Sequence, residues 1–122
     1  MRKIFLRSLT KRRDFELVFR DGVNLASRYL VVYARPNELS FNRLGLSVGK
    51  KLGNAVTRNQ IKRLLREAMR KVIKEIPLNC DFVIVAKRFS VEGRLDDFIL
   101  EMKKIMTRLM NEKNTDITYT II

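Results

Sequence analysis

The residues of this chain best suited to chemistry are cations that recur at helical spacing. Arg58, Lys62 and Arg66 follow one another every four residues, and Asn59 and Arg63 do the same one position further along. Residues four apart are neighbours on a helix surface, so this spacing predicts two adjacent polar rows on one face. Such rows can contact successive phosphates of a nucleic acid backbone. Arg70 extends the cationic face.

The same segment carries an apolar stripe, which indicates a folded helix and not a disordered tail. The stripe predicts a helix from about residue 58 to residue 76, ended by Pro77. Nine basic residues but only one acidic residue, Glu67, lie between residues 50 and 74. Solvated helix faces usually mix the two signs, so a nucleic acid partner explains this face better than solvation alone. The stripe consists of Ile61, Leu64, Leu65, Ala68 and Val72.

Composition is typical of one small basic domain. The chain has 122 residues, 46% of them hydrophobic, and a formal net charge of +13. That length fits a single domain spanning residues 1–122, and the charge favours a polyanionic partner. No signal peptide or membrane segment is predicted, so we expect a soluble cytoplasmic protein without a membrane partner. The single cysteine, Cys80, precludes an internal disulfide and is predicted to be buried.

No constellation for catalysis is evident in the sequence. The chain has no histidine, which removes the commonest general base and metal ligand. Its acidic residues are scattered, and its glycines lack the spacing of a phosphate-binding loop. We therefore predict no catalytic residue and no protein-held metal or cofactor, and interpret the chain as a binding protein.

The remaining periodicities predict an α+β fold. We expect a basic arm over residues 1–9, a helix over 10–21, a strand region over 23–35 with a break or bulge at Ala26–Ser27, and a strand over 43–50. The basic helix, a buried strand over 80–88 and a helix over 95–111 follow. The order is α-β-β-β-α-β-α, with about four strands in a mostly antiparallel sheet, the segments 23–35 and 43–50 being paired. Residues 112–122 are a variable tail that could form a short strand.

Aromatic side chains suggest a second site. Phe15 and Phe19 are four residues apart on the first helix, and Tyr33 could face them from the sheet. Such rings beside strand-end cations would form a stacking platform for single-stranded nucleic acid. Aromatic residues at helical spacing are more often part of a core, and the sequence pattern alone favours that alternative. The cations are Lys50, Lys51, Lys87 and Arg88.

The chain resembles the bacterial ribonuclease P protein family. The segment from Gly53 to Arg70, GNAVTRNQIKRLLREAMR, matches the pattern Gly-x-Ala-x-x-Arg-Asn-x-x-Lys-Arg-x-x-Arg-Glu. The first helix and the strands 28–33, 43–48 and 81–88 occur in the family's order, so the resemblance covers about residues 8–110. Where the family often has a second arginine after Arg58-Asn59, this chain has Gln60. The resemblance therefore does not extend to the phosphate contact of that second arginine. It does not include the final ITYTII either.

The resemblance implies a division of labour between protein and RNA. Family members bind a large catalytic RNA, and the holoenzyme removes the 5′ leader of precursor tRNA by endonucleolytic hydrolysis. Mg²⁺ is held mainly by RNA phosphates, so no cofactor is expected on the protein alone. The resemblance also implies a left-handed β-α-β crossover through the basic helix. The aromatic residues and strand-end cations would line a central cleft for the leader. The expected contacts to the catalytic RNA are Asn54, Arg58, Asn59, Lys62, Arg63, Arg66 and Arg70.

Two other functions are weighed against this one. A ribosomal or other structural nucleic-acid-binding protein could have the same charge, but the Gly53–Glu67 match argues against it. A metal-dependent nuclease acting alone would need the histidines or paired carboxylates that the sequence lacks. The expected partners are therefore the catalytic RNA and precursor tRNA, with no homo-oligomer predicted.

Overall fold

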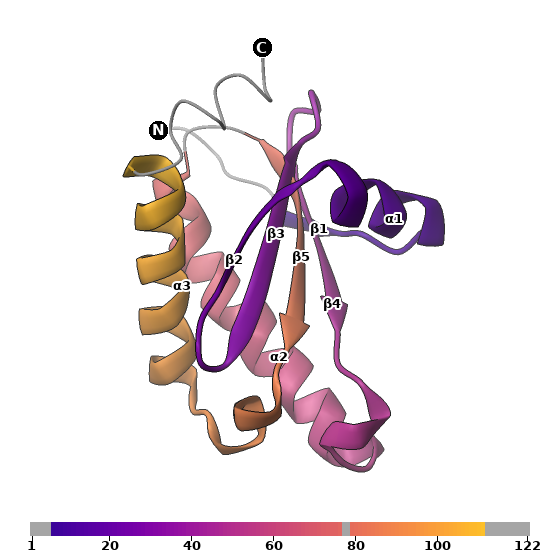
Figure 1. Cartoon of the computed structure of the whole chain (residues 1–122), viewed down its shortest axis with the longest axis vertical. Coiled ribbons are helices and arrows are strands. Elements are labelled where there is room, and N and C mark those ends of the chain that lie inside the picture. Colours follow the sequence, from indigo (N-terminus) through magenta and orange to yellow (C-terminus); the bar gives the residue numbers. More distant parts are fainter. Residues whose placement is uncertain (1–5, 77–78, 112–122) are drawn as a thin grey trace.

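The computed structural model describes residues 6–76 and 79–111, which form an α+β domain (Figure 1). Three α-helices pack against one five-stranded sheet in this part of the chain. In chain order the elements are β1 (Leu6–Ser8), α1 (Arg12–Asp21), β2 (Val23–Ala26), β3 (Leu30–Pro36), β4 (Asn42–Ser47), the 3₁₀ helix η1 (Lys50–Leu52), α2 (Ala55–Val72), the 3₁₀ helix η2 (Ile73–Glu75), β5 (Cys80–Ala86), the 3₁₀ helix η3 (Arg88–Glu92) and α3 (Leu95–Asn111).

The sheet is mixed, in the order β1-β4-β5-β3-β2. β4 pairs in parallel with β1 and β5, whereas β3 pairs antiparallel with β5 and β2. The predicted pairing of segments 23–35 and 43–50 is wrong, because β5 lies between β3 and β4. Periodicity along a strand marks its faces but does not reveal its neighbours. The sheet therefore has as many parallel as antiparallel pairings among the described strands.

The sequence pattern did not predict β1 or β2 as separate strands. The segment 23–35 divides into β2 and β3 at Ser27, whose Oγ accepts hydrogen bonds from the Tyr29 and Leu30 amides, each at 3.3 Å. The break expected at this point is thus a hairpin turn. Residues 6–8, expected in a basic arm, form β1 at the edge of the sheet, in register with residues 42–44 of β4. The C-terminal segment 112–122 lies outside the described residues.

The two faces of the sheet are covered unequally. α2 and α3 pack over one face, where the main core lies, and α1 packs over part of the other (Figure 1). The apolar stripe predicted for α2 is confirmed, since all its members pack in this core and only Leu64 is half-buried. α3 spans residues 95–111, as predicted. The face carrying α1 has a smaller core, built from Leu9, Val18 and Val83 with Phe15, Tyr33 and Val85 packed against it.

The connection from β4 through α2 to β5 joins neighbouring parallel strands. In Figure 1 both strands run down the page, β5 to the left of β4, and α2 rises behind them. This course is left-handed, as the family resemblance implied. Right-handed connections are the strong general preference, so physical reasoning on the sequence alone would have predicted the opposite hand.

Cys80, at the start of β5, is buried as predicted. Burial, with a smaller contribution from the charge of Asp81, raises the pKa of its thiol to about 12. The thiolate is the reactive form, so the folded protein should be almost unreactive at pH 8. We expect alkylation by iodoacetamide to be at least about tenfold slower in the native protein than in urea. Equal rates in the two conditions would show that the thiol is accessible.

Candidate nucleic-acid interface

The start of α2 is defined by a glycine and a capping side chain. Gly53 has φ 145°, a conformation that favours glycine. Asn54 then caps the helix, its Oδ1 accepting a hydrogen bond from the Thr57 amide at 2.9 Å. Asn54, which was predicted to contact RNA, therefore has a structural role as the helix cap. It is also exposed at the end of the helix. This explains why the helix begins at residue 55 instead of the expected 58.

The cations of α2 lie on the side turned away from the core. Arg63, Arg66 and Arg70 are exposed, while Arg58 and Lys62 are half-buried. Arg58 Nε donates to the Gly53 carbonyl at 3.2 Å. Within residues 6–76 and 79–111, none of these five cations forms an ion pair with a carboxylate. The helix thus presents uncompensated positive charge, which phosphates could neutralise.

Gln60, the departure from the family pattern, interacts with the cationic rows. Its Oε1 accepts a hydrogen bond from Arg63 Nη2 at 2.8 Å. The amide thereby restrains the guanidinium of Arg63 without neutralising it. Asn59, beside Gln60, is exposed on the same helix.

The three predicted aromatic residues form one cluster on the opposite face of the sheet. Ring centroids are 6.4 Å apart for Phe15 and Phe19, and 4.9 Å apart for Phe19 and Tyr33, which meet edge to face. Phe19 is 41% exposed, whereas Phe15 packs in the smaller core directly over Gly45. An added Cβ at Gly45 would clash with the Phe15 ring. Phe19 is therefore more available for stacking than Phe15 and Tyr33, which are both half-buried against the smaller core.

The predicted strand-end cations meet at one edge of the sheet. Because β4 and β5 are parallel, Lys50 and Lys51 after β4 lie at the same edge as Lys87 and Arg88 after β5. We call these four exposed residues the basic edge. Lys87 Nζ donates to the Ser27 carbonyl at 2.8 Å, so this ammonium is also tied to the β2–β3 turn.

Half-buried side chains lie between the aromatic cluster and the basic edge. Val31 of β3 and Ser47 of β4 are both in register with Val85 of β5. Strand alternation places Val31 and Val85 on the same face as Tyr33, and Ser47 on the same face as Gly45. All three are only partly covered. A single-stranded nucleic acid could follow this strip from the rings to the cations.

A pocket beside the basic edge includes residues that the sequence interpretation missed. It has a volume of about 530 Å³. The missed signal is an aromatic residue, Phe89, directly after the cations Lys87 and Arg88, a combination suited to nucleic acid. The pocket is lined by Lys51, Leu52, Arg88, Phe89, Val91 and Glu92.

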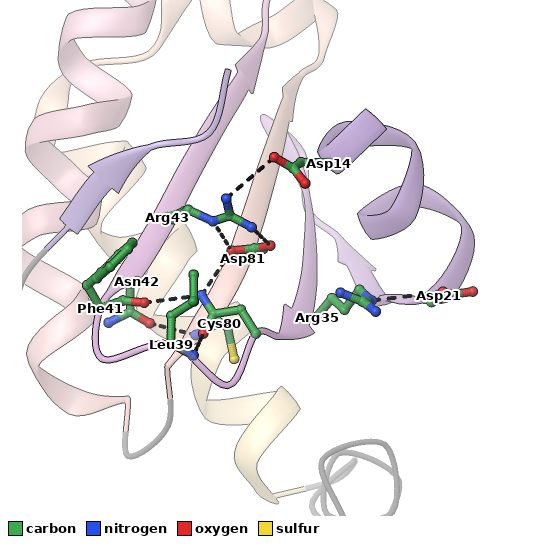
Figure 2. A network of polar contacts seen from close by, with 10 residues as sticks. Asp14, Asp21, Arg35, Leu39, Phe41, Asn42, Arg43, Cys80 and Asp81 are labelled. Atoms are coloured by element: carbon green, nitrogen blue, oxygen red, sulfur yellow. Dashed lines mark hydrogen bonds and ion pairs between the residues drawn. The ribbon is translucent and has the colours of Figure 1, made fainter. Parts of the chain in front are cut away.

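A partly buried network of ion pairs joins β4 to β5 and reaches α1 through Asp14 (Figure 2). Arg43 of β4 donates from Nε and Nη2 to the two carboxylate oxygens of Asp81 in β5, both at 2.7 Å. Its Nη1 reaches Asp14 of α1 at 3.4 Å. The hydrogen bond to Asp81 is the main cause that raises the pKa of Arg43. Asn37 Nδ2 also donates to Asp81, at 2.9 Å.

The carboxylates around Arg43 are engaged within the protein. Asp14 and Asp81 both bind Arg43, and no group of three potential ligands among residues 6–76 and 79–111 is placed to hold a cation. None of the described helices has the length and apolar character needed to cross a membrane.

Fold and surface together define a small basic α+β protein of the nucleic-acid-binding class. Comparison with known proteins gives the family. The family model described as Ribonuclease P matches residues 6–110, which is most of the chain. The chain belongs to the ribonuclease P protein family.

Relatives and solved structures agree with this assignment. The ribonuclease P protein component of Clostridioides difficile is 37% identical over 103 residues, covering 84% of this chain and 90% of that protein. That of Streptococcus pneumoniae is 44% identical over 78 residues, covering 64% of this chain and 63% of that protein. The RNase P protein structure from Staphylococcus aureus matches with a TM-score of 0.73 and 36% identity, covering 82% of this chain and 92% of that one.

A more distant structure shows the same fold. The RNase P protein from Thermotoga maritima matches with a TM-score of 0.69 and 34% identity, covering 81% of this chain and 97% of that one. The predicted family, α+β fold and function are confirmed. The chain is the protein component of an endoribonuclease whose catalysis is carried by its RNA subunit.

Proposed function

We propose that the two faces of this protein bind two different RNAs. The cations of α2 bind the catalytic RNA, and the aromatic cluster with the basic edge binds the single-stranded 5′ leader of precursor tRNA. One copy of the protein acts per catalytic RNA, in the cytoplasm. Mg²⁺ in the assembled enzyme is held by RNA phosphates, and the protein contributes binding and orientation of the substrate.

The observation that carries this proposal is the separation of two kinds of surface. α2 presents cations without carboxylate partners, which suits a folded RNA backbone. On the other face of the sheet, an exposed ring, Phe19, lies beside Tyr33 and a partly covered strip that runs to the basic edge. Aromatic rings followed by cations suit unpaired bases and their phosphates. One surface would anchor the protein while the other contacts substrate.

Phe19→Ala tests the leader site. We expect the assembled enzyme carrying this variant to bind precursor tRNA about 5- to 150-fold more weakly, because a lost base stack costs about 1–3 kcal/mol. Binding of mature tRNA, which has no leader, should be unchanged. The measurement is the ratio of the two dissociation constants at fixed salt and magnesium.

Leu39→Ala is the matched control for this experiment. Leu39 has a similar exposure, 37%, and lies in the β3–β4 loop. Its variant should leave the ratio unchanged. An equal loss of affinity for precursor and mature tRNA with Phe19→Ala, or a lowered Tm without a change in the ratio, would assign the ring to packing alone.

A further inference from the structure

The pocket beside the basic edge is lined by an aromatic residue, Phe89, that is not part of the proposed leader site. Phe89 lies in η3 and is 45% exposed, and Val91 in the same pocket is 47% exposed. Two large apolar side chains thus remain partly exposed in one pocket, where a ligand could cover both. The volume, about 530 Å³, is in the range of small-molecule sites and sufficient for a nucleobase.

Charge around the pocket identifies the chemistry of that ligand. Lys51 and Arg88 line it, and Arg28 lies with its guanidinium 4.7 Å from the centroid of the Phe89 ring. Only one acidic residue, Glu92, is among the lining residues. An apolar wall with a ring, surrounded by three cations, complements a base joined to phosphates. A purely apolar protein segment would leave these cations without partners.

The pocket also adjoins the proposed leader site, because Lys51 and Arg88 of the basic edge line it. Tyr33 is in register with Val83 of β5, and the chain runs from there to Lys87 over roughly 13 Å at the rise of a strand. η3, which contains Arg88 and Phe89, follows directly. A strand stacked on the aromatic cluster and continuing past the basic edge would thus arrive at Phe89 several nucleotides later.

We propose that this pocket holds a further unpaired nucleotide of the precursor tRNA leader, beyond the nucleotides at the aromatic cluster. The base packs against Phe89 and Val91, and the flanking phosphates contact Lys51, Arg88 and Arg28. This inference rests on the proposed function and extends it by a second stacking site. Leader length then becomes a determinant of affinity, because only a leader that passes the basic edge reaches Phe89.

The experiment is a leader-length series with the assembled enzyme. Precursor tRNAs whose leaders grow one nucleotide at a time are titrated against the unmodified protein, Phe89→Ala, Phe89→Leu and Phe19→Ala. We expect Phe89→Ala to match the unmodified protein for short leaders and to bind at least about fivefold more weakly once the leader is long enough. Phe89→Leu should recover only part of the loss, since it keeps apolar area but no ring. Phe19→Ala should lose affinity already with shorter leaders.

Controls separate this inference from the leader site itself. Leu100→Ala, at an exposed apolar residue of α3 that is 54% exposed, should behave as the unmodified protein at every length. If Phe89→Ala has no length-dependent effect while Phe19→Ala does, the second site is wrong and the leader site stands. If neither variant depends on leader length, both proposals fail. A loss that also appears with mature tRNA or with the catalytic RNA alone would overturn the assignment of this pocket to the leader.

Discussion

Asp81→Ala is expected to lower the free energy of unfolding by up to about 3–5 kcal/mol, the range for removing one partner of a fully buried ion pair, since Asp81 is buried whereas Arg43 is 25% exposed. Asp81 is 2% exposed, and its two carboxylate oxygens accept three hydrogen bonds, two from Arg43 and one from Asn37. Arg43 also contacts Asp14 of α1 (Figure 2). Without the carboxylate, Arg43 keeps only the longer contact to Asp14 at 3.4 Å. Urea unfolding at fixed ionic strength measures the change.

The matched control is Asp21→Ala. Asp21 likewise pairs with arginine, in its case Arg20 and Arg35, but lies exposed at the end of α1, where solvent screens these ion pairs. Its unfolding midpoint should stay close to that of the unmodified protein. A double-mutant cycle with Arg43→Ala adds a second criterion, because removing both partners should cost less than the sum of the single changes. Additive losses, or equal losses for Asp81 and Asp21, would contradict a coupled buried pair.

The second large effect is expected for Lys62→Ala/Arg66→Ala in α2. Two lost phosphate contacts should weaken binding of the catalytic RNA at least about tenfold and flatten the plot of log K against log salt by roughly 1.4–1.8. Both residues lie off the apolar stripe in the helical spacing, although Lys62 is half-buried. Binding is measured by filter retention or anisotropy over a salt series, with Tm recorded for each variant.

Lys103→Ala/Lys104→Ala gives the same change in net charge at another place. Both residues are exposed on α3. If the interface is α2, this control should lose little affinity and keep its salt slope. Equal losses for the two double variants would mean that overall charge, and not the α2 surface, determines binding.

The sequence by itself determined the elements whose pattern is local. The stripe from Ile61 to Val72 predicted which side of α2 is buried, and the apolar run beginning at Cys80 predicted a central strand. The Gly53–Glu67 match identified the family. These features follow from side-chain periodicity and from residue types at fixed spacing, which need no knowledge of neighbouring elements.

Only the tertiary structure decided which elements lie side by side. Placing β5 between β3 and β4 brings Lys51 and Arg88 to one pocket although 37 positions separate them in sequence, and it brings Asp81 to Arg43. Strand β1 was missed because three residues at a sheet edge carry too little periodicity. Phe15 and Phe19 are four residues apart on α1, and the sequence pattern does not distinguish them. In the structure Gly45 leaves room for Phe15 to pack on the sheet, whereas Phe19 remains exposed. Burial depends on what packs against a residue, and that is decided by contacts between segments far apart in the chain.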